Sequence, residues 1–402
     1  MMLSVLVADK LSPAAVDALS RLGAVVRTEP DLDGEALVAA IGEAEVLVVR
    51  STKVPRAVIE AGTELSLIVR AGAGVNTIDI AAASEYGVSV ANCPGRNTAA
   101  VAELAIGLMI AADRRIPDAT AHLRAGEWKK KEYGKAYGLL GRTCGIVGFG
   151  SIGRAVAVRA KALGMRVVAW SRSLTAESAE AAGVERCERL VELAGESDVV
   201  SVHLAVAEQT RTLIGAEFFA AMREGAIFVN TSRGEIVDQQ ALAAAVRDRG
   251  VKAALDVYGD EPSRGEAPFD ASEFARELAA ATPHIGASTE QAAEAIAAEV
   301  VRVVETYVKT GKPVNAVNIR ARTEQDVSLV VRHYNRVGVL AGVLDELKDA
   351  GVNVEEMENT IFQGGATASC ALKLDRAPDV ERLRRIRSGR DIIQVMLKER
   401  AP

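Results

Sequence analysis

The feature that most limits how this chain can fold is a glycine-rich turn between a strand and a helix. Residues Thr143–Val147 form a short, mostly apolar run, and Arg154–Leu163 continue as an alanine-rich helical segment. In such a unit the first glycine permits a tight turn, the second lets the backbone approach a phosphate, and the third lets helix and strand pack closely. The helix N-terminus adds unpaired N–H donors for an anion. The turn predicts a site for a dinucleotide pyrophosphate, formed by Gly148, Gly150, Ser151, Ile152 and Gly153.

Strand-like runs alternate with helical segments in two series. The strands expected in the first series are Leu3–Ala8, Val46–Val49, Leu67–Arg70 and Val88–Asn92, with helices at Pro13–Leu22 and Glu35–Ile41. The strands expected in the second series are Thr143–Gly148, Arg166–Trp170, Asp198–His203, Ala226–Asn230 and Ala253–Val257. Alternation of this kind predicts parallel sheets covered by helices on both faces. We therefore expect an α/β fold with two doubly wound, Rossmann-like domains that bind ligands at the carboxyl ends of their strands.

The last part of the chain has a different pattern. A long helix is expected after a capping box at Ser288 and Gln291, and Gly311-Lys312-Pro313 ends it. Residues Arg320–Asp326 are polar and resemble a linker. Strand, helix, strand, strand, helix and strand then follow at Val327–His333, Leu340–Leu347, Val352–Thr360, Ala366–Leu374, Val380–Ile386 and Ile392–Leu397. This order, with a hairpin turn at Gly364-Gly365, predicts a ferredoxin-like βαββαβ module.

Composition and charge exclude several classes of protein. The net charge of -6 argues against nucleic acid or an anionic membrane as the main partner. The longest apolar stretch, Val101–Ala112, contains Glu103 and is too short to cross a bilayer, so we expect a buried helix there, at a subunit contact. Met1–Lys10 has no basic leader and is expected to be an opening strand. The scattered cysteines favour a reducing cytoplasm over a zinc site or disulfides; they are Cys93, Cys144, Cys187 and Cys370.

The strand after the glycine turn bears on the choice of cofactor. An NAD site usually has an acidic residue about 20 positions after the glycines, which accepts a hydrogen bond from the ribose 2′-hydroxyl. Here Ser171 stands in that place and Arg172 follows it. Arg172 can pair with a 2′-phosphate, or it can be a solvated cation beside an adenosine. NAD and NADP both remain open as cofactors.

Three ionisable residues follow the turn, each near the expected end of a strand. Arg233 offers a fork that can hold a carboxylate in a bidentate manner. His284 can take a hydroxyl proton because the pKa of an imidazole lies near working pH. Glu261 can orient the imidazole and stabilise its charged form. These are the groups needed to oxidise a secondary alcohol beside a carboxylate, so we predict Arg233, Glu261 and His284 as the catalytic residues.

The blocks that carry these residues resemble a known family. Residues Gly148–Gly153, Asn230–Asp238, Leu255–Pro262 and Pro283–Thr289 are similar to the motifs of the D-isomer-specific 2-hydroxyacid dehydrogenases. The resemblance covers nearly all of residues 1–318. It implies that Arg233 binds substrate, that His284 is the acid/base with Glu261 as its partner, and that Asp256 lies near the nicotinamide. It also implies a substrate domain of residues 1–98 and 287–318, a dinucleotide domain of residues 99–286, and a cleft between them.

Two loops of the first series indicate which hydroxy acid is bound. Arg50, Ser51 and Lys53 follow one strand, and Gly72, Ala73 and Gly74 follow the next. Cations and exposed backbone N–H groups suit a substrate with phosphate at one end and carboxylate at the other. Both loops are similar to those of the phosphoglycerate dehydrogenase branch of the family, which implies that Arg50 and Lys53 hold phosphate. The alternative is that both are solvated loop cations.

The module at residues 325–402 is similar to the serine-sensing ACT domains of that branch. The likeness implies that His333, Asn335 and Asn353 bind L-serine between two paired modules. Val337 replaces the proline that is usual before the glycine, which alters the stiffness of this turn. The alternative is a module that only dimerises.

These features predict an NAD- or NADP-dependent enzyme that oxidises 3-phospho-D-glycerate to 3-phosphohydroxypyruvate, the first step of L-serine biosynthesis. We expect a homodimer or homotetramer inhibited by L-serine, with no metal, nucleic acid or membrane partner. The basic run Arg124–Lys135 is expected to be solvated or to approach the other subunit's cleft. Two rivals remain: an NADP-dependent glyoxylate or hydroxypyruvate reductase of the same family, and a non-catalytic, nucleotide-sensing corepressor.

Overall fold

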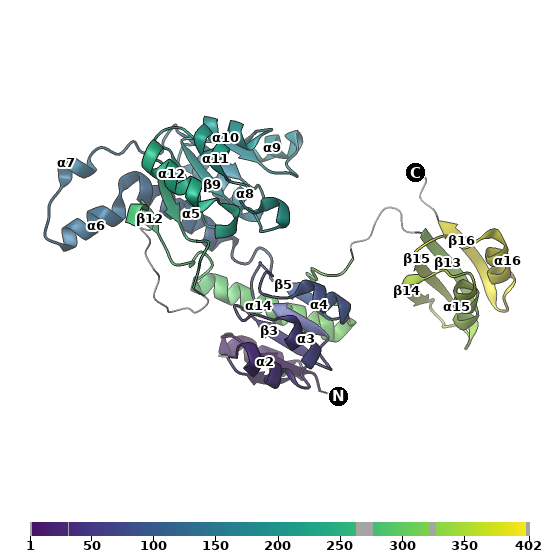
Figure 1. Cartoon of the computed structure of the whole chain (residues 1–402). Coiled ribbons are helices and arrows are strands. Elements are labelled where there is room, and N and C mark those ends of the chain that lie inside the picture. Colours follow the sequence, from purple (N-terminus) through teal and green to yellow (C-terminus); the bar gives the residue numbers. More distant parts are fainter. Residues whose placement is uncertain (1, 31, 263–275, 321–326, 399–402) are drawn as a thin grey trace. The chain divides into compact units, whose positions relative to one another are not determined.

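The computed structural model describes residues 2–30, 32–262, 276–320 and 327–398 (Figure 1). The chain forms two compact units, residues 1–318 and residues 319–402. Most of the expected linker Arg320–Asp326 lies outside the described residues. Among the described residues, no helix combines the length and the apolar character that crossing a bilayer requires.

The first unit contains a five-stranded parallel sheet in the order β2-β1-β3-β4-β5. Its strands are β1 (Ser4–Val7), β2 (Val25–Thr28), β3 (Val46–Val49), β4 (Leu67–Arg70) and β5 (Ser89–Asn92). One face packs against α2 (Gly34–Ile41), α3 (Arg56–Ala61) and α4 (Ile80–Glu85), and the other packs against α1 (Pro13–Arg21) and α14 (Glu290–Thr310). The carboxyl ends of β1 and β3 are neighbours where the strand order reverses, which is where such sheets bind ligands.

The edge strand β2 was not assigned from the sequence. Its residues Val25–Thr28 are mostly exposed, so this strand lacks the continuous apolar run of β1, β3 and β4. The central strands were predicted within a residue or two, because burial on both faces requires apolar residues at every position.

A second, seven-stranded parallel sheet has the order β12-β11-β10-β9-β6-β7-β8. Its strands are β6 (Thr143–Val147), β7 (Arg166–Trp170), β8 (Glu185–Arg186), β9 (Val199–Val202), β10 (Ile227–Asn230), β11 (Lys252–Leu255) and β12 (Ala280–Ala281). The chain runs from β6 outward to β8 and then returns to β9 on the other side of β6. The reversal therefore lies between β6 and β9, next to the glycine turn, as a dinucleotide-binding domain requires.

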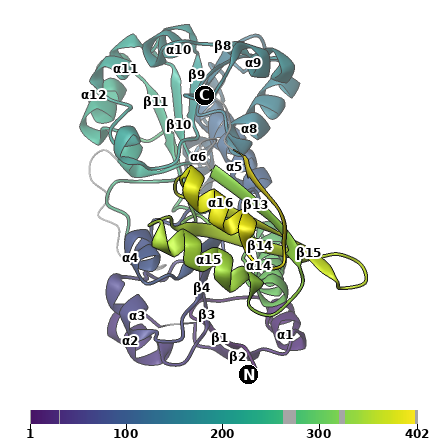
Figure 2. The same ribbon diagram turned by 90° about the vertical axis from the view of Figure 1, so that its right-hand side faces the viewer.

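Helices cover both faces of this second sheet (Figures 1 and 2). One face carries α5 (Thr98–Arg114), α8 (Ser151–Ala162) and α9 (Ala176–Ala182), and the other carries α10 (Leu190–Glu196), α11 (Ala216–Ala221) and α12 (Gln239–Arg249). The apolar stretch Val101–Ala112 lies within α5, which is largely buried, as predicted. Short elements outside these layers are α6 (Ile116–Arg124), α7 (Lys130–Tyr133), η1 (Glu208–Thr210) and η2 (Gly234–Ile236).

The long helix α14 differs from its predicted start by one residue. Thr289, not Ser288, is the N-cap, and its side chain accepts a hydrogen bond from the backbone N–H of Ala292 at 3.1 Å. The predicted capping box at Ser288 and Gln291 is therefore wrong. The helix ends at Thr310, and Gly311 adopts the left-handed conformation (φ 70°) that glycine favours at this position.

The second unit is a four-stranded antiparallel sheet with two helices on one face, the predicted ferredoxin-like βαββαβ fold. Its elements are β13 (Val327–Tyr334), α15 (Val339–Asp349), β14 (Val354–Ile361), β15 (Thr367–Leu374), α16 (Val380–Ser388) and β16 (Ile392–Lys398). The strand order is β14-β15-β13-β16. Both turn glycines of the β14–β15 hairpin, Gly364 and Gly365, have positive φ, which explains the strong local signal in the sequence.

A buried carboxylate ties α14 to the segments before and after it. Glu299 is 3% exposed, and it accepts hydrogen bonds from Arg96 Nη2 at 2.6 Å, Arg302 Nε at 3.0 Å and Asn315 Nδ2 at 2.7 Å. The hydrogen bond from Arg302, supported by Arg96 and Asn315, lowers the pKa of Glu299 to about 2 although burial acts to raise it. The carboxylate stays ionised at any pH near neutrality.

We expect Glu299→Ala to lower the free energy of unfolding by about 2–3 kcal/mol, because the charged acceptor of three donors is lost. The folded-state pKa lies below the ordinary value of 4.5, so the contribution of Glu299 is present above pH 4.5 and is lost as the pH falls toward 2. Urea denaturation at neutral pH measures the change. The matched control is Glu305→Ala on the same helix, which removes an exposed ion pair with Lys309 and is expected to cost less than about 0.5 kcal/mol. Equal effects of both substitutions would contradict the assignment.

Candidate active site

The glycine turn has the geometry of a pyrophosphate cradle. Gly148 has φ 95°, and a Cβ there would lie 2.4 Å from the carbonyl oxygen of His203. A Cβ at Gly153 would lie 2.1 Å from the carbonyl oxygen of Gly148. Helix α8 can therefore pack this closely against the end of β6 only if residue 153 is glycine. Space over Gly150, in contrast, is open to at least 4 Å. This opening, beside the first turn of α8, admits a phosphate close to the backbone.

Two buried polar atoms without a partner lie at the carboxyl ends of neighbouring strands of the second sheet. Among the six such side-chain atoms of the described residues, His203 Nδ1 follows β9 and Thr231 Oγ1 follows β10. A third, Asn97 Oδ1, precedes α5. Unpaired buried polar atoms are costly, so the pair at the strand ends indicates that a polar ligand completes them. The residues present fit a dinucleotide.

Ser171 and Arg172 lie at the carboxyl end of β7, where the adenosine ribose is expected. Ser171 is half-buried and Arg172 is exposed, and the backbone oxygen of Ser171 accepts a hydrogen bond from Leu174 N at 3.1 Å. Within the described residues no carboxylate lies within ion-pair distance of Arg172. Its guanidinium is therefore available for an anion from a ligand.

Glu261 and His284, which are 23 residues apart in sequence, form a hydrogen-bonded pair. Nδ1 of His284 donates to Oε2 of Glu261 at 2.6 Å, and the backbone N–H of Tyr258 donates to Oε1 at 2.9 Å. Partial burial acts to raise the pKa of Glu261, but the hydrogen bonds from His284 and Tyr258 hold it below its ordinary value. The contact leaves Nε2 of His284 for a substrate, and this side chain is 43% exposed.

Asp256 builds the turn that presents His284. It is 1% exposed; Oδ1 accepts from Thr282 Oγ1 at 2.6 Å and from Ile285 N at 2.8 Å, and Oδ2 accepts from Gly286 N at 2.9 Å. His284 itself has φ 52°, an uncommon conformation for a residue with a side chain. The carboxylate of Asp256 thus contacts the peptides that follow His284. Whether it also approaches the nicotinamide stays a prediction.

Arg233 reaches from the second sheet toward the first. Asn230 Nδ2 donates to the Arg233 carbonyl oxygen at 3.0 Å, and Arg233 Nη1 donates to the carbonyl oxygen of Ser232 at 2.7 Å. A Cβ built at Gly74 would lie 2.6 Å from Arg233 Nη2, so the guanidinium lies against this glycine. The positive charge of Arg233 also helps to lower the pKa of Glu261. The predicted catalytic residues therefore share one site.

The structure adds Arg70 to this site, which sequence analysis did not select. A Cβ at Gly72 would lie 1.6 Å from Arg70 Nη1, and Arg70 Nε is buried without a partner. Burial, and then the charges of Arg233 and Arg50, lower the pKa of the Arg70 guanidinium to about 10. Its position at the end of β4, directly before the glycine loop, was the available signal. Gly72 and Gly74 thus make room for arginines.

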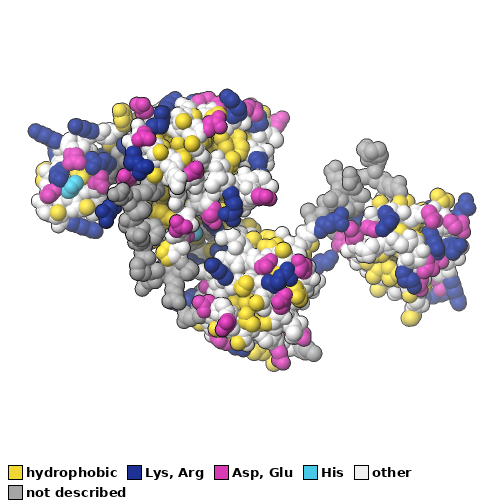
Figure 3. Space-filling model, viewed as in Figure 1, with side chains coloured by type: hydrophobic (Ala, Val, Ile, Leu, Met, Phe, Trp, Pro, Cys, Tyr) yellow, Lys and Arg dark blue, Asp and Glu magenta, His cyan; other side chains and the backbone are white. Residues whose placement is uncertain are grey.

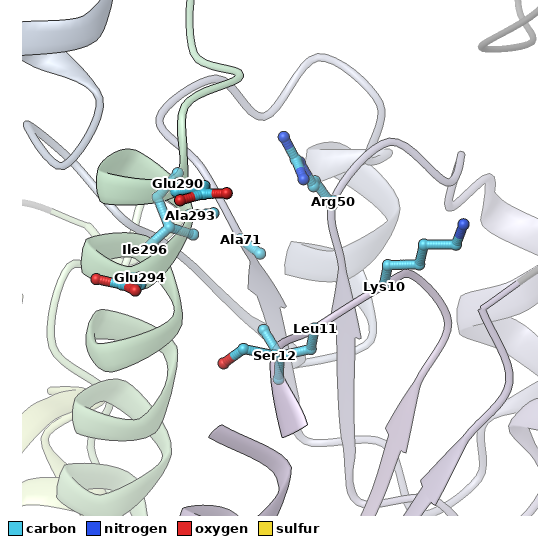
Figure 4. A pocket seen from close by; sticks show the side chains of 9 residues that line it. All are labelled: Lys10, Leu11, Ser12, Arg50, Ala71, Glu290, Ala293, Glu294 and Ile296. Carbon is cyan, nitrogen blue, oxygen red and sulfur yellow. The ribbon is translucent and has the colours of Figure 1, made fainter. Parts of the chain in front are cut away.

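Arg50 lines a pocket of about 210 Å³ at the carboxyl ends of β1 and β3 (Figure 4). Its wall is formed by Lys10, Leu11, Ser12, Ala71, Glu290, Ala293, Glu294 and Ile296. In Figure 4 Arg50 and Glu290 extend toward the same space, whereas Lys10 extends away from it. Lys53 is exposed and Arg50 is half-buried, so the two residues predicted to bind phosphate differ in their exposure to solvent.

The loop that carries Arg50 is held by Asp9, another residue that sequence analysis missed. Asp9 Oδ2 accepts hydrogen bonds from the backbone N–H groups of Arg50 at 2.6 Å, Ser51 at 3.1 Å and Thr52 at 3.0 Å, and Ser51 Oγ lies 3.4 Å from Oδ1. Three successive N–H groups around one oxygen form an anion-binding nest that an internal carboxylate fills. The hydroxyl and N–H of Ser51 are thereby engaged within the protein.

The three predicted effector residues do not meet within one C-terminal unit. His333 is 2% exposed, with Nδ1 2.8 Å from the Tyr334 carbonyl oxygen and Nε2 3.3 Å from Asn359 Oδ1. Asn335 bonds to Gly365 and Ala366, before β15, whereas Asn353 bonds to Asp375, after β15. An eight-residue strand separates these ends by about 25 Å.

Comparison with known proteins matches residues 106–286 to the D-isomer specific 2-hydroxyacid dehydrogenase, NAD binding domain. The chain is 37% identical over 358 residues to D-3-phosphoglycerate dehydrogenase of Methanocaldococcus jannaschii, covering 89% of this chain and 67% of the relative. It is 41% identical over 303 residues to hydroxypyruvate reductase of Thermotoga maritima, covering 74% of this chain and 95% of the relative. The chain spans about two thirds of the length of several phosphoglycerate dehydrogenases that it matches.

Solved structures show the same likeness. The NAD⁺-bound 3-phosphoglycerate dehydrogenase of Entamoeba histolytica superposes with a TM-score of 0.67 at 28% identity, over 80% of this chain and all of that one. A glyoxylate reductase from Paecilomyes thermophila gives a TM-score of 0.70 at 29% identity, over 79% of this chain and 98% of that one. The fold and the cofactor class predicted from the sequence are confirmed.

We expect Glu261→Gln to reduce the rate of 2-hydroxy acid oxidation by about 10- to 100-fold while leaving cofactor affinity unchanged. Glutamine keeps the size of the side chain but removes the negative charge beside His284 Nδ1, so the ring is less well oriented and its charged form loses its partner. Steady-state rates and cofactor titration by fluorescence measure the two effects. Asp260→Asn, an exposed neighbour, is the control. A Glu261→Gln enzyme as fast as wild type would show that the pair has no catalytic role.

Proposed function

Because the chain belongs to the D-isomer-specific 2-hydroxyacid dehydrogenases, we propose that it oxidises 3-phospho-D-glycerate to 3-phosphohydroxypyruvate, which is the first step of L-serine biosynthesis. The observation that carries this proposal is the convergence of Arg50 and Arg233 on Arg70 in the described structure: burial is the main cause of the lowered pKa of Arg70, and the charges of the other two arginines lower it further. A monoanionic substrate leaves much of this charge uncompensated, whereas a phosphate and a carboxylate together relieve it.

In the proposed mechanism the loops after β3 and β4, together with Arg233, supply the substrate contacts. Arg50 receives the phosphate, with Lys53 at the exposed rim. The N–H groups of the Gly72–Gly74 loop and the fork of Arg233 receive the carboxylate and polarise the C2 oxygen. Arg70, buried against Gly72, contributes charge to both ends. The substrate carbon is thereby held between the glycine loop and His284.

Proton transfer is the second part of the proposed mechanism. Nε2 of His284 takes the proton of the C2 hydroxyl, while Nδ1 stays hydrogen-bonded to Glu261, whose negative charge stabilises the imidazolium. The nicotinamide, when bound, accepts hydride from C2. Asp256 maintains the turn that aims the imidazole.

For the cofactor we propose that both NAD and NADP are accepted. Ser171 and Arg172 support this, since no carboxylate is present to repel a 2′-phosphate and the guanidinium of Arg172 has no ion-pair partner among the described residues. The same two residues favour the second candidate function, reduction of hydroxypyruvate or glyoxylate with NADPH. The hydroxypyruvate reductase relative, of which the chain covers 95%, adds to that alternative.

Initial rates with purified protein test the proposal. We expect oxidation of 3-phosphoglycerate with both cofactors, and we expect Arg50→Met to raise KM for 3-phosphoglycerate by about 10- to 100-fold, because a charge-assisted contact to phosphate is lost. The KM for D-glycerate, which lacks the phosphate, should change little in the same variant, and this is the internal control. Preference of the wild type for unphosphorylated substrates would favour the reductase. Tight cofactor binding without turnover of any substrate would favour the nucleotide sensor.

Two copies of the chain are proposed to pair, with L-serine as an inhibitor bound between their C-terminal units. An arm around α6 and α7 supports pairing, because Trp128, Tyr137 and Leu140 are 80%, 89% and 83% exposed there. Basic side chains gather over the same arm (Figure 3). Serine needs a second copy because Asn335 and Asn353 lie at opposite ends of one unit.

We expect light scattering to give a dimer or tetramer, and L-serine to slow 3-phosphoglycerate oxidation in a saturable manner. Asn353→Ala should abolish the response to serine and leave the rate without serine unchanged, because Asn353 lies in the unit that carries none of the catalytic residues. A monomer, or a wild-type rate that serine does not alter, would contradict this proposal.

A further inference from the structure

The glycine loop that is proposed to receive the substrate carboxylate is held from behind by β5 and the residue after it. Asn92 Nδ2 donates to the carbonyl oxygen of Ala73 at 2.6 Å, and the backbone N–H of Cys93 donates to that of Gly72 at 2.9 Å. Within the described residues, the backbone N–H groups of Ala73 and Gly74 have no acceptor. The loop therefore has fixed carbonyls and free donors.

Because peptide groups are planar, these two hydrogen bonds to carbonyl oxygens also fix the directions of the N–H groups of Ala73 and Gly74. The carbonyl oxygen and the following N–H of a trans peptide point in opposite directions and cannot turn independently. The hydrogen bond from Asn92 to Ala73 thus directs the Gly74 N–H away from β5, and the bond from Cys93 to Gly72 does the same for the Ala73 N–H. Two adjacent donors directed alike form the kind of concavity that binds a carboxylate.

Asn92 is in turn held by the segment that follows α14. The backbone N–H of Asn92 donates to the Asn315 carbonyl oxygen and Asn315 Nδ2 donates to the Asn92 carbonyl oxygen, both at 3.3 Å. Asn315 Nδ2 also donates to Glu299 Oε1 at 2.7 Å. Asn315 has φ 59°, so a strained residue makes these contacts.

The same segment extends the first sheet before it leaves the first unit. Ala316 forms an antiparallel bridge with Ala91, the backbone N–H of Val317 donates to Val90 O at 2.8 Å, and Asn318 Oδ1 accepts from Val90 N at 2.8 Å. Residue 319 already belongs to the second unit. Within the first unit, the segment that precedes residue 319 therefore reaches the glycine loop through Asn315 and Asn92.

We propose that Asn92 is a positioning residue for the substrate carboxylate, and that Asn315 holds Asn92 so that the segment leading to the second unit sets substrate affinity. This inference rests on the proposed function, because it assumes that the Gly72–Gly74 loop binds the carboxylate. It assigns to Asn92 no contact with substrate or cofactor. Loss of the Asn92 donor frees the Ala73–Gly74 peptide to rotate, so substrate binding weakens while the chemistry of His284 is untouched.

The test compares Asn92→Asp with Asn92→Ala in the full-length chain. Aspartate has the shape of asparagine but donates no hydrogen bond to Ala73, so both variants should raise KM for 3-phosphoglycerate by about three- to tenfold. The kcat value and the KM for the cofactor should stay within about twofold of wild type, as expected of a group that affects ground-state and transition-state binding equally. Wild-type behaviour of Asn92→Asp would reduce Asn92 to a packing role and overturn the proposal.

A binding measurement separates this proposal from the proposed function. Oxamate, an inert analogue of a 2-oxo acid, is titrated into protein saturated with NADH, and quenching of the NADH fluorescence gives its dissociation constant. Weaker oxamate binding by Asn92→Asp supports the positioning role even where 3-phosphoglycerate is not the substrate. Equal dissociation constants for wild type and Asn92→Asp, or no oxamate binding by wild type, would overturn it.

The role of Asn315 is tested by a matched pair of variants. Asn315→Gly removes the amide but tolerates the positive φ, so it isolates the side chain from backbone strain. It should raise KM for the hydroxy acid about two- to threefold by loosening Asn92. Asn318→Ala breaks the other amide contact of the same segment, to Val88 and Val90, without touching Asn92, and should leave KM unchanged. Equal changes in both variants, or none in Asn315→Gly, would exclude a specific role for Asn315.

Discussion

Two guanidinium groups pack against one small glycine loop, a third lies near enough to act on one of them, and the accommodation of these cations is the constraint around which the site is organised. Arg70 is buried against Gly72, Arg233 lies against Gly74, and both glycines are needed because a Cβ at either position would overlap a guanidinium. Burial, and then the charges of Arg233 and Arg50, lower the pKa of Arg70. Bound anions relieve repulsion of this kind, and this is the physical basis of the proposal that the substrate carries more than one negative charge. The same clustered positive charges that favour binding of an anionic substrate therefore destabilise the site when no substrate is bound.

The order of the elements was predictable because it follows from local physics. Strands buried on both faces must be apolar throughout, glycines at Gly148 and Gly153 are enforced by backbone clashes, and the hairpin at Gly364 needs positive φ. These signals lie within a few residues of the structure that they specify. The edge strand β2 gave no such signal, because one exposed strand needs no apolar run. The start of α14 was wrong by a residue because Ser288 and Thr289 are equally good caps in sequence.

The site was predictable only in part, because its supports are distant in sequence. Glu261 and His284 were paired through a family motif, and the structure brings them to 2.6 Å. Asp9, which fills the nest at Ser51, lies 42 residues before it, and nothing in the sequence near Ser51 indicates that this serine is engaged. Arg70 carries no sequence signal of its own, because an arginine at a strand end is usually solvated; only its packing against Gly72 places it in the site. Long-range contacts of this kind require the fold.

The glycine loop and the turn that carries His284 are oriented in the same way. In each, a side chain on the side away from the ligand hydrogen-bonds to the backbone, so that the remaining free groups face the ligand. In the first sheet, Asn92 fixes a carbonyl oxygen and thereby directs an N–H; in the second, Asp256 accepts from the N–H groups of Ile285 and Gly286 and thereby holds His284 at φ 52°. Strained or flexible loops persist only when their surroundings determine them. Because the supports are side chains at or directly after the ends of β5 and β11, the glycine loop and the imidazole keep their directions before any ligand binds. Pre-organisation of this kind lowers the cost of orienting substrate against cofactor, which is a large part of what a dehydrogenase must supply.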